Sequence, residues 1–315
     1  MGNDDGELGL IRPICDGECG IRFAADARQR GRVATIETRF IPTNGIRQHV
    51  ALAGPADARP VLLIHGLGWD HSLWHDEFGM LAAAGWRVIA PDLRGMGKSD
   101  KPDEPYSVGL YVADLLALLD ALAIERVAVV GFSLGGMIAL ALAARAPARI
   151  GAALIACASA ASTPEGAQAT EAMLARALKL GPRRFAEEQA QAIWSREWAR
   201  DHPAEVRRFI AWRASVDQDA LARAFRASHG VDLGRKLARV TAPVRVVVAA
   251  ADSFVSVESG RALADALPDA DLVVVERAGH MVSIERPEEF RATLRDFLDR
   301  NWPPVAALVK VGVPA

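Results

Sequence analysis

An uncharged run from Val127 to Ala144 constrains the fold of this chain more than any other feature. Its length approaches that of a membrane-spanning helix, but the segment Gly131-Phe132-Ser133-Leu134-Gly135-Gly136 interrupts it. Three glycines and a serine in six residues are typical of a turn that joins a buried strand to a buried helix. The run therefore predicts a strand, a turn and a helix in a globular core, and no membrane span.

Short runs rich in β-branched residues alternate with longer Ala- and Leu-rich segments. This is the pattern of a parallel sheet that helices cover on both faces. The predicted strands are residues 35–40, 47–53, 61–65, 87–90, 127–131, 152–156, 244–250 and 272–276. The predicted helices are residues 73–84, 108–122, 133–145, 257–267 and 287–299. We expect an α/β fold with a mostly parallel, eight-stranded sheet.

The pattern changes at residue 163, where the strand-like runs give way to a helical, charge-rich segment that extends to residue 234. We expect this insertion to lie over the ends of the sheet as a helical cap. The predicted organisation is an N-terminal extension (1–33) whose composition suits a mobile segment, core (34–162), cap (163–234), core (235–300) and C-terminal tail (301–315).

Composition narrows the classes of partner. The 37 basic and 39 acidic residues are spread along the chain and give a net charge of −2, which lacks the basic footprint of a nucleic-acid-binding protein. A small-molecule partner is expected, and homo-oligomer formation stays open. The odd set Cys15, Cys19 and Cys157 suits a reducing compartment, and the first residues lack the apolar run of a secretory signal, so the expected location is cytoplasmic.

The turn within the uncharged run matches G-x-S-x-G, the nucleophile elbow, and has the strand before it and the helix after it that this motif requires. Ser133 is therefore the candidate nucleophile, and Gly131 and Gly135 are expected to let strand and helix pass closely. The N–H of Leu134, at the start of the helix, is one candidate oxyanion donor. The N–H of Leu67, in the glycine-flanked loop after the third strand, is the second.

A serine nucleophile needs a base, and the base needs an acid that fixes its tautomer. His280 and Asp252 each follow a predicted strand, so both are expected at the carboxyl edge of the sheet, where ligands bind in open parallel sheets. Glu276, Glu285 and Asp92 are the alternative acids, and Asp92 is expected to organise its own turn instead.

Two other histidine patterns, at His65 and at His71 with His75, are expected to be structural. His65, at a strand end, is predicted to hold its loop by hydrogen bonds. His71 and His75 have helical i, i+4 spacing, but glutamate does not follow His71 and a third ligand is missing, so no metal site is predicted. No cofactor is expected.

With these residues in place, residues 35–299 resemble the α/β-hydrolase superfamily. The resemblance includes the His65-Gly66-Leu67-Gly68 loop, the segment 92–99, the serine elbow, Asp252 and Gly279-His280, in the family's order. Dehalogenases and epoxide hydrolases use aspartate at the elbow, whereas this chain has Ser133. The chain is most similar to serine esterases, enol-lactonases, carbon–carbon hydrolases and cofactor-free haloperoxidases.

The resemblance implies hydrolysis of a small, largely apolar ester or lactone through an acyl-enzyme on Ser133. Carbon–carbon hydrolysis, perhydrolase or haloperoxidase activity, and cofactor-independent oxygenation are the alternatives on the same triad. A non-catalytic receptor on the same fold is a further alternative, but the presence of all three triad residues argues against it. The candidate pocket residues are large aromatic groups near the elbow, in the cap and after the seventh strand: Phe132, Trp194, Trp198, Trp212 and Phe254.

Overall fold

The computed structural model describes residues 36–302, and in this part of the chain eight strands form one sheet in the order β1-β2-β4-β3-β5-β6-β7-β8. The strands are β1 (Glu37–Thr43), β2 (Ile46–Ala53), β3 (Arg59–Ile64), β4 (Trp86–Pro91), β5 (Val127–Phe132), β6 (Ile150–Ala156), β7 (Val244–Ala249) and β8 (Ala270–Val275). β2 runs antiparallel to both β1 and β4, and the other neighbours are parallel. The predicted fold class is confirmed.

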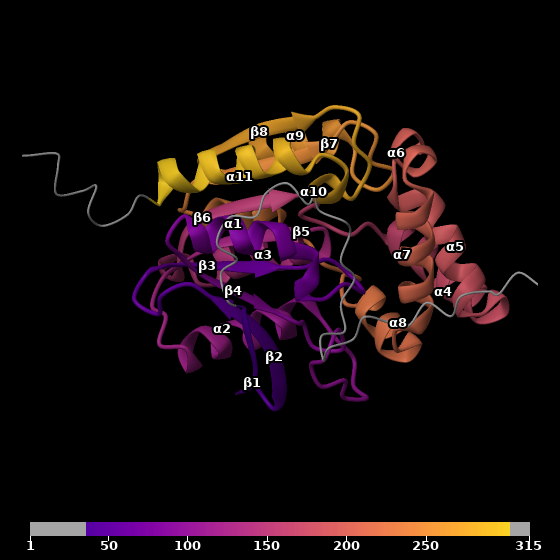
Figure 1. Ribbon diagram of the computed structural model, residues 1–315, viewed down its shortest axis with the longest axis horizontal. Helices are drawn as coiled ribbons and strands as arrows, with labels where there is room; N and C mark the ends of the chain where they lie inside the picture. Colours follow the sequence, from indigo (N-terminus) through magenta and orange to yellow (C-terminus); the bar gives the residue numbers. More distant parts are fainter. Residues whose placement is uncertain (1–35, 303–315) are drawn as a thin grey trace, which may run out of the picture.

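Helices cover both faces of the sheet (Figure 1). α1 (His75–Ala83) and α11 (Pro287–Asn301) pack on one face, and α2 (Val108–Ala121), α3 (Leu134–Arg145) and α9 (Val257–Ala266) pack on the other. Along β3, Val61 and Leu63 belong to one core cluster while Leu62 and Ile64 belong to the other, because successive side chains point to opposite faces. Residues 61–64 of β3 are all apolar and buried because neither face of the sheet meets water there.

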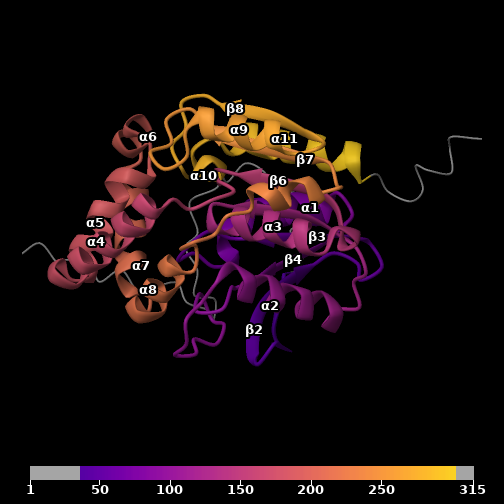
Figure 2. The ribbon, with the colours of Figure 1, turned by 180° about the vertical axis from the view of Figure 1, so that it is seen from behind.

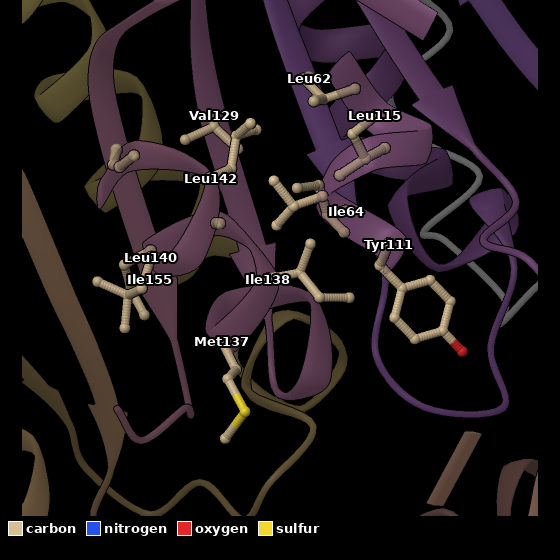
Figure 3. Packing of buried hydrophobic residues seen from close by; sticks show 14 of the residues in the cluster. Leu62, Ile64, Tyr111, Leu115, Val129, Met137, Ile138, Leu140, Leu142 and Ile155 are labelled. Atoms are coloured by element: carbon tan, nitrogen blue, oxygen red, sulfur yellow. The ribbon is translucent and has the colours of Figure 1, made fainter. Parts of the chain in front are cut away.

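The cluster that contains Leu62 and Ile64 includes the contact between α3 and the central strands. Figure 3 shows Ile138 and Leu142 of α3 close to Ile64 and Val129 of the sheet, and all four are fully buried. β5 lies between β3 and β6, with Gly131 paired to Ile64 on one side and to Ile155 on the other. The turn that follows β5 therefore begins at the centre of the sheet and is held by both neighbours.

Five helices are inserted between β6 and β7. They are α4 (Pro164–Leu180), α5 (Pro182–Ile193), α6 (Arg196–Asp201), α7 (Pro203–Ser215) and α8 (Gln218–Arg226), followed by the 3₁₀ helix η3 (Gly234–Arg239). Figures 1 and 2 show α4–α8 grouped beside the sheet, on the side toward which β6 and β8 point. A β-bridge between Ala161 and Asp232 closes the base of this helical insertion.

Local capping explains where the helices begin. The Ser107 side chain accepts the Leu110 N–H at the start of α2, and Thr163 accepts the Gly166 N–H at the start of α4. The predicted helix 73–84 is mostly α1, which the 3₁₀ helix η1 (His71–Trp74) precedes. The turn starts earlier than predicted because the Asp70 side chain accepts the Ser72 N–H.

The remaining elements are short, η2 (Pro147–Arg149) and α10 (Val282–Glu285). The predicted N-terminal extension with Cys15 and Cys19, and the tail beyond residue 302, lie outside the described residues. Within residues 36–302, no helix is long and apolar enough to cross a membrane.

Candidate active site

Ser133 stands on a strained turn between β5 and α3. Its φ of 54° and ψ of −119° place it outside the helix, which begins at Leu134 and not at Ser133 as predicted. A Cβ on Gly131 would lie 2.3 Å from the Gly135 carbonyl oxygen, and one on Gly135 would lie 2.2 Å from the Ile64 carbonyl oxygen. Both contacts are too short for any side chain, so the turn requires glycine at both positions.

A chain of hydrogen bonds links Ser133 to two residues from other loops. Ser133 Oγ lies 3.0 Å from His280 Nε2, and His280 Nδ1 lies 2.8 Å from Asp252 Oδ2. The Asp252 side chain is fully buried, and its other oxygen accepts the Phe254 N–H at 2.8 Å. An ionised carboxylate only accepts hydrogen bonds, so Nδ1 of His280 carries the proton and Nε2 is free to accept one from serine.

The alternative acids lie elsewhere in this arrangement. Glu276 is exposed just beyond β8. Glu285 is buried and accepts the N–H of Gly279 at 2.9 Å and the N–H of Ser195 at 3.2 Å. Burial raises the pKa of Glu285 above its usual range. Glu285 therefore connects the loop of His280 to the helical insertion, a role that sequence reasoning missed.

The loop after β3 comes close to Ser133. A Cβ on Gly66 would lie 3.3 Å from the Ser133 Cβ. The Trp69 N–H donates to the Gly66 carbonyl and the Gly68 N–H to the Met96 sulfur, whereas no acceptor for the Leu67 N–H is found among residues 36–302. Leu134 is the first residue of α3, where N–H groups have no partner within the helix. Both candidate oxyanion donors thus border the same region as Ser133 Oγ.

The comparisons with known proteins agree with this geometry. Residues 61–293 match the sequence model of the alpha/beta hydrolase family. This chain belongs to that family. A protein from Variovorax paradoxus (strain S110), named "Putative carbamate hydrolase RutD", is 33% identical over 273 residues, which are 85% of this chain and 99% of the relative. The relatives support a hydrolase.

Solved α/β-hydrolase structures superpose over most of the chain. An enol-lactonase from Burkholderia xenovorans LB400 gives a TM-score of 0.77 at 27% identity, over 82% of this chain and 99% of its own. A thermophilic esterase from Thermogutta terrifontis gives a TM-score of 0.75 at 26% identity, over 85% of this chain and 99% of its own.

Cys157, to which the sequence assigned no role, follows β6 in this α/β-hydrolase and has a positive φ of 49°. Its Sγ lies within 4.8 Å of ligand atoms of Asp252 and His280. Burial, then the nearby Asp252 carboxylate, raises the pKa of the Cys157 thiol well above its usual range, so the group stays neutral. Because both His280 nitrogens already face hydrogen-bond partners and the thiol stays neutral, this trio is poorly suited to hold a metal ion.

His65 has the structural role that its position predicts. It is buried, its Nδ1 donates to the Gly66 carbonyl at 2.8 Å, and its Nε2 accepts the Leu93 N–H at 2.9 Å. Burial lowers the pKa of His65, which keeps the ring neutral, so that one nitrogen donates a hydrogen bond and the other accepts one. The residue thereby joins the loop after β3 to the loop after β4.

Asp92 organises its turn, as expected, and also receives two histidine rings. It accepts the backbone N–H groups of His71 and Lys98 and lies 2.9 Å from His49 Nδ1 and 2.7 Å from His71 Nδ1. Burial would raise the pKa of Asp92, but the hydrogen bonds from the two rings hold it well below its usual range. These three side chains could face a metal ion, but four donors already occupy the carboxylate.

The candidate pocket residues separate into two groups. Phe132 is buried and Phe254 is 61% exposed, and the centroid of each ring lies 4.9 Å from that of His280. The three tryptophans pack among aromatic rings instead: Trp194 stacks on Trp198 at 4.4 Å, and Trp212 lies 4.6 Å from Trp69. The structure brings only the two phenylalanines into ring contact with His280.

Proposed function

We propose that this α/β-hydrolase cleaves a carboxylic ester or lactone of a small molecule through an acyl-enzyme on Ser133. The observation that carries the proposal is the unbroken chain from Ser133 Oγ through His280 to Asp252, at 3.0 and 2.8 Å. These distances are those of a nucleophile, its base and the acid that orients the base. The burial of Asp252 strengthens its interaction with the imidazolium that forms during proton transfer.

Each step uses an atom of this chain. Ser133 Oγ attacks the carbonyl carbon and its proton moves to His280 Nε2, while Asp252 stabilises the charged ring. The N–H groups of Leu67 and Leu134 hold the oxyanion. When the tetrahedral intermediate collapses, His280 gives the proton to the departing alkoxide. Water then loses a proton to His280 and attacks the acyl carbon. As this second tetrahedral intermediate collapses, His280 returns the proton to Ser133 Oγ and the carboxylic acid departs. These steps need no metal or organic cofactor.

Hydrolysis of a carbamate is a second candidate, favoured by the full-length similarity to the protein named as a carbamate hydrolase. The carbonyl of a carbamate could accept the same attack by Ser133. Similarity to the enol-lactonase and to the esterase supports the ester or lactone instead. The two candidates share the nucleophile and the oxyanion donors, and they differ in the leaving group and in the acyl substituent.

A fluorophosphonate probe and a substrate panel test the proposal. The probe should label Ser133 in the parent protein and leave Ser133→Ala unlabelled. Matched panels of p-nitrophenyl esters, lactones and carbamates should then show which bond is cleaved. Oxygen consumption without hydrolysis, or ester turnover that survives Ser133→Ala, would contradict the acyl-enzyme.

A further inference from the structure

Arg213, in α7 of the helical insertion, is a buried cation without a carboxylate partner among residues 36–302. Only 5% of the surface of Arg213 is exposed to solvent. Nε donates to Gln189 Oε1 at 2.7 Å and Nη1 to the Leu67 carbonyl at 3.3 Å, and no acceptor for Nη2 is found in the described part of the chain. A charged side chain this buried is normally paired with an opposite charge. Within residues 36–302 the Arg213 guanidinium instead contacts an amide, a carbonyl and the Phe225 ring, whose centroid lies 5.8 Å from its central carbon.

The other buried arginines show the usual arrangement. Arg94 lies 2.7 Å from Asp114, and Arg245 lies 2.8 Å from Asp296. Burial without such a partner lowers the pKa of Arg213 to about 9, which still leaves it protonated at neutral pH. Nη2 is not among the fully buried side-chain atoms of residues 36–302 that lack a partner, so this nitrogen is accessible to solvent and to a ligand.

The guanidinium lies against the loop that carries the candidate oxyanion donor. A Cβ on Gly68 would lie 1.5 Å from Arg213 Nη1, so the guanidinium occupies the space beside the Gly68 backbone. Gly66, two residues earlier, is the residue packed against Ser133. Because consecutive Cα atoms are about 3.8 Å apart, Arg213 Nη1 and the Ser133 Cβ are at most about 15 Å apart. The guanidinium and Ser133 therefore border the same loop after β3.

We propose that Arg213 binds a carboxylate of the substrate, so that the acyl group cleaved at Ser133 carries a negative charge. The substrate class is a half-ester of a dicarboxylic acid, or a lactone that bears a carboxylate. This inference rests on the proposed ester or lactone hydrolysis. The planar guanidinium forms paired hydrogen bonds with a carboxylate, and Gln189 fixes the plane from the Nε side.

A purely structural role would give a different result. The bond from Nη1 to the Leu67 carbonyl also joins the helical insertion to the loop. If this were the whole role, loss of Arg213 would disturb the loop for every substrate equally. Selective loss toward charged substrates is expected only if the guanidinium contacts the substrate.

Matched methyl esters test the proposal. Monomethyl succinate, glutarate and adipate each carry a carboxylate where methyl butyrate, pentanoate and hexanoate carry a methyl group. We expect the parent to prefer at least one half-ester by tenfold or more in kcat/KM, measured by acid release at constant pH. Arg213→Gln should lower kcat/KM for that half-ester by about 10- to 100-fold, mostly through KM, and change the neutral ester by less than about threefold.

Two further variants complete the design. Arg213→Lys keeps the charge but not the paired geometry, and it should fall between the parent and Arg213→Gln. Arg208, on the same helix, is exposed and paired with Glu205 at 2.7 Å, so Arg208→Gln should change neither class of ester. Equal loss toward both classes in Arg213→Gln, or a parent without preference for half-esters, would overturn the proposal.

Inhibition of the parent protein gives an answer even if Arg213→Gln fails to fold. Free adipate should inhibit hydrolysis of the neutral ester competitively, and hexane-1,6-diol at the same concentration should not; equal inhibition would count against the carboxylate site. If no ester is hydrolysed at all, the proposed function fails separately. Calorimetric titration with adipate then tests the carboxylate site alone. Binding to the parent that weakens about tenfold or more in Arg213→Lys supports the site, and absence of binding to the parent refutes it.

Discussion

Glu77, in α1, is a buried carboxyl group whose stability effect depends strongly on pH. It is 2% exposed, and its Oε1 has no hydrogen-bond partner within residues 36–302. Burial raises the pKa of Glu77 from 4.5 to about 8, and the neighbouring Asp76 adds to the rise. The folded state therefore holds a proton that the unfolded chain releases above pH 4.5. The resulting stabilisation of the protonated fold is complete below pH 4.5 and is lost as the pH rises through 8.

The size of the effect follows from the shift. The difference between about 8 and 4.5 is about 3.5 pKa units, and one unit corresponds to about 1.36 kcal/mol, so ionisation in the folded state costs roughly 5 kcal/mol. Most of this cost, about 4 kcal/mol, should develop between pH 5 and pH 9. Glu77→Gln keeps the shape of the side chain and cannot ionise, so it should not lose that stability.

Urea unfolding at pH 5, 7 and 9 measures the effect. The free energy of unfolding of Glu77→Gln minus that of the parent should rise by about 4 kcal/mol from pH 5 to pH 9, because all other ionisable groups cancel in the difference. Glu289→Gln, an exposed substitution in α11, is the matched control and should give a nearly constant difference. A constant difference for Glu77→Gln as well would refute the reasoning.

Other substitutions test the site and its support. Asp252→Asn should lower kcat by about 10⁴-fold in a steady-state assay, because it favours the wrong tautomer of His280; a loss below tenfold would count against the acid. Gly135→Ala should cost about 3 kcal/mol or more in urea unfolding, since its Cβ would meet the Ile64 carbonyl, and an unchanged midpoint would contradict this. Trp194 is buried, so Trp194→Ala should lower Tm and leave the acyl preference unchanged. Phe254 is exposed beside His280, so Phe254→Ala should leave Tm near the parent value and shift the relative kcat/KM among acyl chains by up to about 1–3 kcal/mol. The opposite pattern would reverse the two roles.

Local pattern predicted most of the fold. Apolar runs predicted the eight strands because a strand buried on both faces tolerates few polar side chains, and their observed ends differ from the predicted ones by at most a few residues. Glycine spacing around Ser133 predicted the turn because only glycine permits the close approach of β5, α3 and β3. These constraints act over a few residues of chain, so they can be read without knowing what packs nearby.

The choice among acids shows where local pattern stops. Asp252 and Glu285 both follow the carboxyl edge of the sheet in sequence, and the carboxylates of both are buried near His280. Only the folded chain shows that Asp252 faces the ring while Glu285 accepts N–H groups from Gly279 and from Ser195, 90 residues away. Sequence order favoured the acid that the structure places beside His280, but it held no signal for the connection made by Glu285.

The sequence by itself determined the α/β class, the strained serine turn and the residue types that a hydrolase needs, because periodicity and backbone sterics are local properties of the chain. Only the tertiary structure decided that Arg213 is buried beside a loop 146 residues away, with no carboxylate partner in the described part of the chain, and that Cys157 lies against Asp252. Burial and the sign of the nearest charge depend on residues that meet only after folding.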